Sequence, residues 1–212
     1  MRPEPHRYSL MCLTLDGQAW SHEEQADRLC YAGARWIQLR MKQAALPHWI
    51  ATARAVVDVC RAHGAVCIIN DSVEVALAVQ ADGAHLGRSD EQWAEARRRL
   101  GPGPLLGGTV NDSEDARRAI DAGCLDYVGV GPWRYTATKQ QLSPVLGSSG
   151  VRSLVAMLDG VPAWVIGGIE PGDLAAVRAT GAAGVAVASG LFRGNQVATN
   201  FHAYTGAWAA AG

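Results

Sequence analysis

The sequence has no excess of charge of either sign, because 19 Lys and Arg residues face 20 Asp and Glu residues, and the 212 residues carry a formal net charge of −1. This balance gives no broad positive field, so we expect no nucleic-acid partner and no anionic membrane partner, although it is compatible with a local basic pocket. The chain also lacks an apolar run near the roughly 18 residues of a membrane span. Its first residues lack the apolar core of a signal peptide. We therefore expect a cytoplasmic protein.

Several short motifs are missing as well. The five cysteines are scattered and never spaced as CxxC, which indicates neither a disulfide framework nor a zinc site. HExxH, GxSxG, GxxxxGK[ST] and a complete GxGxxG are also absent, so the familiar signatures of zinc peptidases, serine hydrolases, P-loop proteins and dinucleotide-binding proteins are missing. Of the six histidines only His85 falls in an expected strand, where we expect a packed core imidazole rather than a general base.

Short apolar runs alternate with segments of helical period along the whole chain. Strands are predicted over residues 9–14, 35–39, 66–69, 83–86, 105–108, 126–130, 163–166 and 184–187. Helices are predicted over residues 22–32, 49–63, 72–79, 91–100, 113–122, 150–158 and 172–180, with a final helix within 198–211. Gly33, Gly123 and Gly181 stand where a left-handed residue would end a helix before the next strand.

Eight strand–helix units in one chain predict an α/β fold, a single (β/α)8 TIM barrel. No linker or charge block divides the sequence, so we expect one domain over residues 1–212, with 1–8 as an N-terminal extension and 194–212 as a C-terminal helix and tail. An open doubly wound sheet is the alternative fold, but it more often has five or six strands. The active site of a barrel lies at the C-terminal ends of its strands, so the polar residues that follow the strands are the candidates.

Glycines after the last two expected strands are typical of a phosphate site. Gly167-Gly168 follows the seventh strand, and Ala188-Ser189-Gly190 follows the eighth. Loops of this kind let backbone N–H groups approach a phosphate. Either glycine stretch alone favours a plain tight turn, but their joint position in an eightfold pattern favours phosphate binding.

Two carboxylates follow neighbouring strands. Asp71 comes after the third strand and Asp90 after the fourth, so their side chains are expected to converge where they could share Mg²⁺ with phosphate oxygens and water. The same stretches also fit helix starts, with Asp71 as one N-cap and Ser89 as another just ahead of Asp90. The spacing alone leaves both interpretations open.

Basic residues follow two of the strands and are candidates for binding anions. Arg40 and Lys42 lie two residues apart after the second strand, so in an extended chain both side chains point the same way. Lys139 ends the run Thr136-Ala137-Thr138-Lys139, whose hydroxyls suit a second anionic group. The whole set predicts a site for a diphosphate with its metal beside a separate monophosphate. Trp133 and Tyr135 precede this run as core residues or as the wall for an aromatic substrate.

Taken together, these stretches resemble the thiamine-phosphate synthases, or thiamine-phosphate pyrophosphorylases. The resembling stretches occur in the family's order between residues 10 and 192, namely 38–42, 68–71, 81–87 with Asp90, 131–132, 136–139, 166–169 and 185–190. The resemblance implies a TIM barrel that joins 4-amino-5-hydroxymethyl-2-methylpyrimidine diphosphate to a thiazole phosphate. The implied products are thiamine phosphate and pyrophosphate.

The resemblance also implies a role for each residue of the site. Asp71 and Asp90 would hold Mg²⁺, and Arg40, Lys42 and Lys139 would be the catalytic residues. The pyrimidine diphosphate would contact these three together with Gln38 and Asn70, with Thr109 at its ring, and the thiazole phosphate would contact Thr136, Thr138, Gly167, Gly168, Ala188 and Ser189. The implied partners are small phosphorylated substrates, with a homo-oligomer as a further candidate.

The sequence departs from the family's pattern at several positions. Met41 stands where an acidic residue is usual, Arg88 where Gln is common and Asn111 where His is frequent, and the stretch 133–135 is bulkier than usual. Two alternative functions therefore stay open. One is the thiazole tautomerase branch of the same family, which commonly has His where this chain has Pro132. The other is a non-catalytic barrel that binds a phosphoester.

Overall fold

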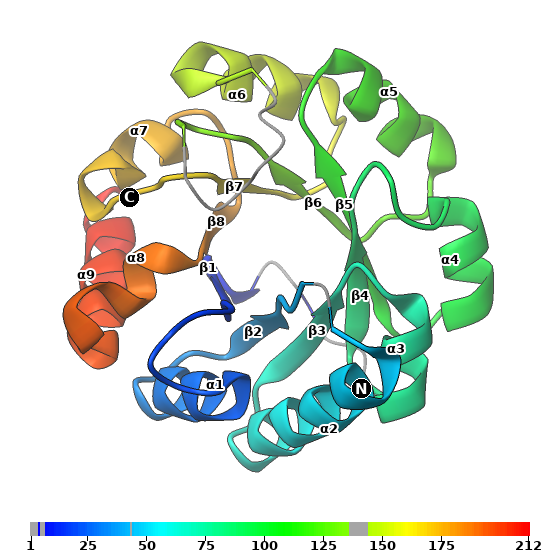
Figure 1. Cartoon of the computed structure of the whole chain (residues 1–212). Coiled ribbons are helices and arrows are strands. Elements are labelled where there is room, and N and C mark those ends of the chain that lie inside the picture. The colour runs from blue at the N-terminus through cyan, green and yellow to red at the C-terminus, as the bar shows by residue number, and fades with distance from the viewer. Residues whose placement is uncertain (1–3, 5–6, 43, 136–143) are drawn as a thin grey trace.

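The computed structural model describes residues 4, 7–42, 44–135 and 144–212. Within these residues eight strands pair in sequence order, all parallel, and β1 pairs with β8 to close the barrel. Figure 1 shows the closed ring of strands with the helices around it. The predicted (β/α)8 TIM barrel is thereby confirmed. The strands are β1 Leu10–Leu13, β2 Trp36–Leu39, β3 Val66–Asn70, β4 Gly83–Leu86, β5 Leu105–Val110, β6 Tyr127–Val130, β7 Ala163–Ile166 and β8 Gly184–Val187.

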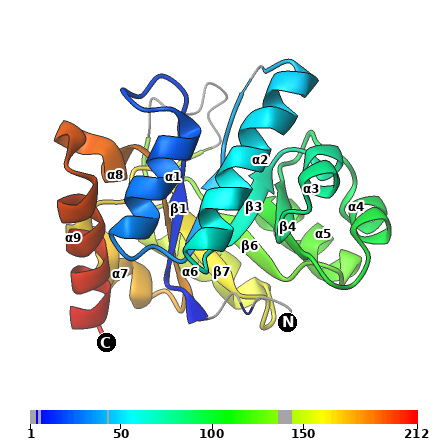
Figure 2. The same cartoon turned by 90° about the horizontal axis from the view of Figure 1, so that it is seen from below.

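The helices follow the strands one by one and cover the outside of the barrel. They are α1 His22–Tyr31, α2 Leu46–Ala62, α3 Val73–Val79, α4 Trp93–Leu100, α5 Ser113–Ala122, α6 Gly147–Met157, α7 Leu174–Arg178, α8 Ser189–Phe192 and α9 Val197–Ala210, with short 3-10 turns η2 Pro171–Asp173 and η3 Arg193–Asn195. In Figure 2 the loop between β1 and α1 lies at the upper edge, which is therefore the edge where the strands end. No helix in the part of the chain that the structure describes has the length and hydropathy of a membrane span.

The strands are buried on both faces because one face lines the barrel interior and the other meets the helices. Near the starts of the strands, the interior is filled by Trp36, Tyr127 and Trp164. Their ring centroids lie 5.0 Å apart between Trp36 and Tyr127, 4.9 Å between Trp36 and Trp164, and 5.8 Å between Tyr127 and Trp164, all edge to face. This aromatic floor blocks the interior at the strand starts, so polar residues further along the strands face the opposite mouth.

The predicted element boundaries are correct to within a few residues, with differences near the helix starts. Helix α2 begins at Leu46 because Pro47 occupies its first turn, where a missing N–H costs nothing. The predicted helix 172–180 is split into η2 and the short α7. Helix α8 was not predicted because four residues are too few to show a helical period. Gly33, Gly123 and Gly181 all have positive φ, as their positions at helix ends require.

Candidate active site

Most of the predicted site residues lie at the mouth formed by the strand ends. Gln38 lies in β2, Asn70 ends β3, Thr109 lies in β5, and Ser189 begins α8. The remaining described members lie in the loops after β2, β3, β4, β7 and β8, namely Arg40, Lys42, Asp71, Asp90, Gly167, Gly168 and Ala188. Three predicted residues, Thr136, Thr138 and Lys139, lie outside the described residues. The described members thus come from six of the eight strand–helix units.

Asp71 is held at the site by both its backbone and its carboxylate. It has a left-handed conformation (φ 65°), which Asp tolerates better than most residues, and its amide donates to the carbonyl oxygen of His85 at 2.8 Å. Its carboxylate forms an ion pair with the ammonium of Lys42, in the loop after the neighbouring strand β2. The suggestion that Asp71 caps the next helix is wrong, since the hydroxyl of Ser72 accepts from the amide of Val75 at 3.1 Å and Ser72 is the N-cap.

Asp90 closes the turn that follows β4. Its carboxylate accepts from the amide of Gly87 at 2.7 Å. The alternative with Ser89 as a helix cap is wrong, because α4 begins at Trp93, after Gln92. Partial burial raises the pKa of Asp90, and the adjacent carboxylate of Asp71 raises that pKa further. The two carboxylates therefore lie near each other, as the positions of their strands predicted, and a cation shared between them stays a prediction.

The loop after β2 is anchored by residues that follow β1. The amide of Arg40 donates to the hydroxyl of Thr14 at 3.2 Å, and the amide of Lys42 donates to the carboxylate of Asp16 at 2.9 Å. The half-exposed ammonium of Lys42 reaches toward Asp71, while its neighbour Met41 is buried in the core around the barrel. Lys42 thus reaches the neighbouring loop after β3, whereas Met41 packs into the core.

Beneath the mouth, a chain of polar side chains crosses the barrel interior. The imidazole of His85 lies 3.0 Å from the hydroxyl of Thr109 through Nε2 and 3.3 Å from the hydroxyl of Tyr127 through Nδ1. Gln38 also hydrogen-bonds to Tyr127, and its amide donates to the sulfur of Met11 at 3.3 Å. Burial lowers the pKa of His85 to about 4, so the ring is neutral at neutral pH.

Thr109 was assigned to the site from the sequence, but Tyr127 and the hydrogen-bonded side chains that connect the two were missed. Two glycines within strands were the signal that could have indicated this connection. A Cβ at Gly107 would lie 2.2 Å from the Tyr127 ring and 2.6 Å from His85 Nδ1, and a Cβ at Gly129 would lie 3.3 Å from the same imidazole. Glycine within a strand indicates the close approach of another group, which here is this polar chain.

Some of the glycines after β7 and β8 allow close packing, and one is exposed at the mouth. Gly167 has φ 104°, and a Cβ there would lie 2.8 Å from Cα of Pro132, so only glycine fits. A Cβ at Gly190 would meet the hydroxyl of Tyr204, which donates to the carbonyl oxygen of Ile169 at 2.8 Å. Gly168 also has positive φ and is exposed. Ser189, at the start of α8, is exposed as well. Tight packing explains why Gly167 and Gly190 carry no side chain, while phosphate binding by Gly167, Gly168, Ala188 and Ser189 stays a prediction.

Two residues that were candidates for the wall of an aromatic substrate have different environments. Trp133 is buried in the core around the barrel, and its amide donates to the carbonyl oxygen of Ile166 at 2.9 Å, so it is a core residue. Tyr135 is 69% exposed. Between them, the guanidinium of Arg134 forms an ion pair with Asp173 at 2.6 Å, which ties the loop after β6 to η2.

The chemistry of the described site is that of charge and hydrogen bonding. Among residues 4, 7–42, 44–135 and 144–212, no group of three or more His, Cys, Asp or Glu side chains is placed to hold a metal ion alone. Asp71 and Asp90 supply only two hard oxygen ligands, so a divalent cation there would need oxygens from a ligand or from water, as Mg²⁺ commonly does. The site suits a phosphorylated ligand that brings its own oxygens.

Comparisons with known proteins agree with this geometry. Residues 10–191 match the family described as thiamine monophosphate synthase. The thiamine-phosphate synthase of Bacteroides fragilis is 39% identical over 189 residues, which cover 87% of this chain and 92% of that protein. That of Laribacter hongkongensis is 42% identical over 159 residues, with 75% and 74% covered. A solved structure, the thiamine phosphate pyrophosphorylase from Pyrococcus furiosus, has a TM-score of 0.87 and 27% identity, and the alignment covers 97% of this chain and 98% of that one.

Proposed function

The chain belongs to the thiamine monophosphate synthase family, and from that membership we propose that it joins 4-amino-5-hydroxymethyl-2-methylpyrimidine diphosphate to a thiazole phosphate, forming thiamine phosphate and pyrophosphate. The observation that carries this proposal is the convergence of Asp71, Asp90 and Lys42 at the mouth of the barrel. A diphosphate needs both positive charge and a metal there. These three side chains supply one positive charge and two metal ligands.

Mg²⁺ is the cofactor that this site fits. Burial and, to a smaller extent, repulsion by the Asp71 carboxylate raise the pKa of Asp90, and a shared cation would relieve that repulsion. Carboxylate oxygen is also the ligand type that Mg²⁺ prefers. We assign Asp71 and Asp90 as its protein ligands. Mg²⁺ bound there would neutralise charge on the diphosphate and so make pyrophosphate a better leaving group.

The proposed reaction needs positioning and charge rather than a protein nucleophile. The bond between the pyrimidine methylene carbon and the diphosphate oxygen breaks, the electron pair leaves with pyrophosphate, and the thiazole nitrogen then bonds to the resulting carbocation. Arg40, Lys42 and Lys139 stabilise the leaving group, and Gln38 and Asn70 orient it. The hydroxyl of Thr109, fixed by His85 at 3.0 Å, faces the pyrimidine ring.

The thiazole phosphate occupies the opposite side of the mouth. Its proposed contacts are Thr136, Thr138, Gly167, Gly168, Ala188 and Ser189. The positive φ of Gly167 and Gly168 and the exposure of Gly168 support this assignment, because such backbone brings N–H groups to the surface. Holding both substrates in line converts their encounter into an intramolecular step.

The decisive test is a coupled assay of pyrophosphate release by the whole chain. We expect release only when both substrates and Mg²⁺ are present. Asp71→Asn keeps the side-chain size and the tolerance for the left-handed backbone but removes the charge, so turnover is expected to fall by at least about 100-fold. Asp58→Asn is the matched control, since Asp58 lies on the outer surface of α2, its side chain is 66% exposed, and it should leave turnover unchanged.

Other outcomes of this assay point to the alternative functions. Isomerisation of the thiazole without the pyrimidine substrate would identify a tautomerase. Tight binding of the thiazole phosphate without turnover would identify a binding protein. Equal rates for the wild type and Asp71→Asn would remove the metal assignment. A cytoplasmic location, a single domain over the whole chain and a homo-oligomer stay predictions beside this proposal.

A further inference from the structure

The turn that carries Asp90 is short and is closed on itself. The amide of Gly87 donates to the carboxylate of Asp90 at 2.7 Å, and the amide of Asp90 lies 3.4 Å from the carbonyl oxygen of Gly87. Arg88 and Ser89 occupy the corner of this turn, and both are exposed. Any group that fixes the corner therefore also fixes the position of the Asp90 carboxylate.

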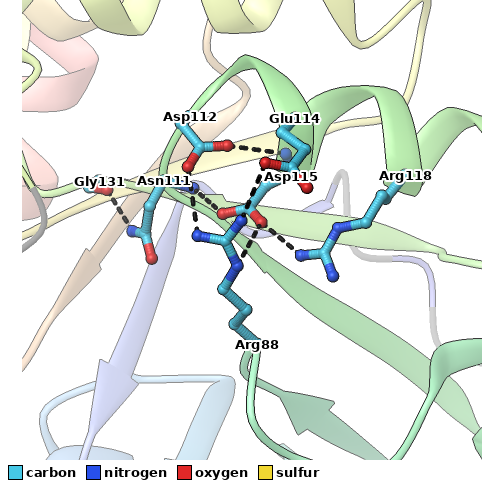
Figure 3. A network of polar contacts seen from close by, with 7 residues as sticks. All are labelled: Arg88, Asn111, Asp112, Glu114, Asp115, Arg118 and Gly131. Atoms are coloured by element: carbon cyan, nitrogen blue, oxygen red, sulfur yellow. Dashed lines mark hydrogen bonds and ion pairs between the residues drawn. The ribbon is translucent and has the colours of Figure 1, made fainter.

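Arg88 fixes that corner by reaching sideways to the next strand–helix unit. Figure 3 shows its guanidinium among three carboxylates at the start of α5. Its nitrogens lie 3.4 Å from Asp112, 3.4 Å from Glu114 and 3.5 Å from Asp115. The planar guanidinium has N–H donors in several directions and can pair with three carboxylates at once, whereas a single ammonium cannot pair with all three in this arrangement.

Asp115 is the rigid end of this connection. Its side chain is fully buried, and its carboxylate accepts from the amide of Asn111 at 2.9 Å and pairs with Arg118 as well as Arg88. Asp112 caps α5 by accepting from the amide of Asp115 at 2.8 Å, and this bond lowers the pKa of Asp112. A buried carboxylate with several donors has little freedom to move, so it is a fixed point for Arg88.

The same network extends to the third loop of the mouth. The side-chain amide of Asn111 donates to the carbonyl oxygen of Gly131, directly after β6 (Figure 3). The loops after β4, β5 and β6 are therefore joined by one set of hydrogen bonds and ion pairs. Among the three, only the turn after β4 carries a proposed metal ligand, Asp90.

We propose that Arg88 is a positioning residue for Mg²⁺ binding: it clamps the Gly87–Asp90 turn to the buried Asp115 and so holds the Asp90 carboxylate ready for the metal. This inference rests on the proposed function of Asp71 and Asp90 as metal ligands. In this role Arg88 acts through Asp90 and binds neither substrate nor metal itself. Groups that orient a metal ligand commonly change metal affinity by about 10–100-fold when they are removed.

The test measures metal binding directly, with Mn²⁺ alone as an electron-paramagnetic-resonance probe in place of Mg²⁺. Arg88→Ala is expected to weaken Mn²⁺ binding by about 10-fold, and to raise the Mg²⁺ concentration for half-maximal pyrophosphate release by a similar factor. The kcat at saturating Mg²⁺ should change little, because the carboxylate ligands are retained. Arg88→Lys keeps one charge but not the fork of donors, so it should recover part of the affinity.

Two further variants keep the test decisive. Arg98→Ala is the matched control, since Arg98 on α4 pairs only with Glu95 in the described structure, its side chain is 74% exposed, and it should alter neither metal affinity nor activity. Glu114→Gln removes one exposed partner of Arg88 and should weaken Mn²⁺ binding in the same direction, to a smaller extent. If Arg88→Ala fails to fold, the Mn²⁺ affinity of Glu114→Gln tests the clamp instead.

The outcomes separate this inference from the proposed function. Wild-type Mn²⁺ affinity in Arg88→Ala and in Glu114→Gln would overturn the clamp, even if the melting temperature fell, and would leave the proposed reaction intact. If the wild type bound no Mn²⁺ and needed no Mg²⁺, the metal assignment and the clamp would both be wrong.

Discussion

Acidification is expected to destabilise this barrel through His85. The imidazole is buried between the hydroxyls of Thr109 and Tyr127, and burial lowers its pKa from 6.5 to about 4. In the unfolded chain the pKa returns to its ordinary value, so the unfolded state binds more protons than the folded state between these two pH values. The stability gained from keeping this histidine neutral is complete above the unfolded pKa and is lost as the pH falls toward the folded pKa.

The magnitude follows from the two pKa values. At pH 5 the unfolded state is favoured about 30-fold by proton binding at this one site, which corresponds to ~2 kcal/mol. The loss approaches about 3 kcal/mol below the folded pKa. These figures are a large share of the roughly 5–15 kcal/mol by which a typical domain is stable.

Urea unfolding at pH 7 and at pH 5 measures this effect when the wild type is compared with His85→Gln. Glutamine keeps hydrogen-bonding groups near Thr109 and Tyr127 but does not titrate, and the other histidines are the same in both proteins. The free energy of unfolding of the wild type should fall by about 2 kcal/mol more than that of the variant between the two pH values. Equal losses in the two proteins would refute the assignment of a neutral, buried His85.

Two further predictions concern the scaffold around the site. Gly167→Ala should lower the free energy of unfolding by about 2 kcal/mol or more, because the new methyl group would overlap Pro132 at a left-handed position. Gly103→Ala is its control, since nothing lies within 4 Å of a Cβ there and the change should be small. Arg97→Ala should cost about 3 kcal/mol in urea unfolding, because its guanidinium bonds three backbone carbonyl oxygens and the largely buried Asp126 carboxylate. The exposed Arg98→Ala should show little change, and equal losses for the two arginines would contradict this role of burial.

The alternation of apolar runs and helical segments was enough to predict the barrel. The predicted strands are short and mostly apolar, so each is expected to be buried on both faces, and eight such strands with short connections close into a ring. The closed fold then dictates that the strand ends meet at one mouth. For that reason Asp71 and Asp90, in loops after neighbouring strands, could be placed together without any contact being known.

The sequence did not show whether Asp71 and Asp90 lie in helix caps or are available to bind a ligand. Asp71 and Ser72 are both good N-caps, and the choice between them depends on backbone angles: the left-handed Asp71 ends the strand, and Ser72 begins the helix. Likewise Ser89 preceded a plausible helix, yet the chain first makes a tight turn at Asp90. Local propensity does not decide between such neighbours, because the tertiary path of the loop does.

The sequence by itself determined the repeating order of strands and helices, and with it the end of the barrel where polar residues gather, because hydrophobic periodicity is a local property of the chain. Only the tertiary structure decided which partners those residues have. Arg88 lies in the turn after β4 and Asp115 lies in α5, 27 residues further along the chain, so no local pattern links them. The buried position of Trp133 and the chain from Gln38 to Thr109 likewise depend on how side chains from separate strands fill one interior.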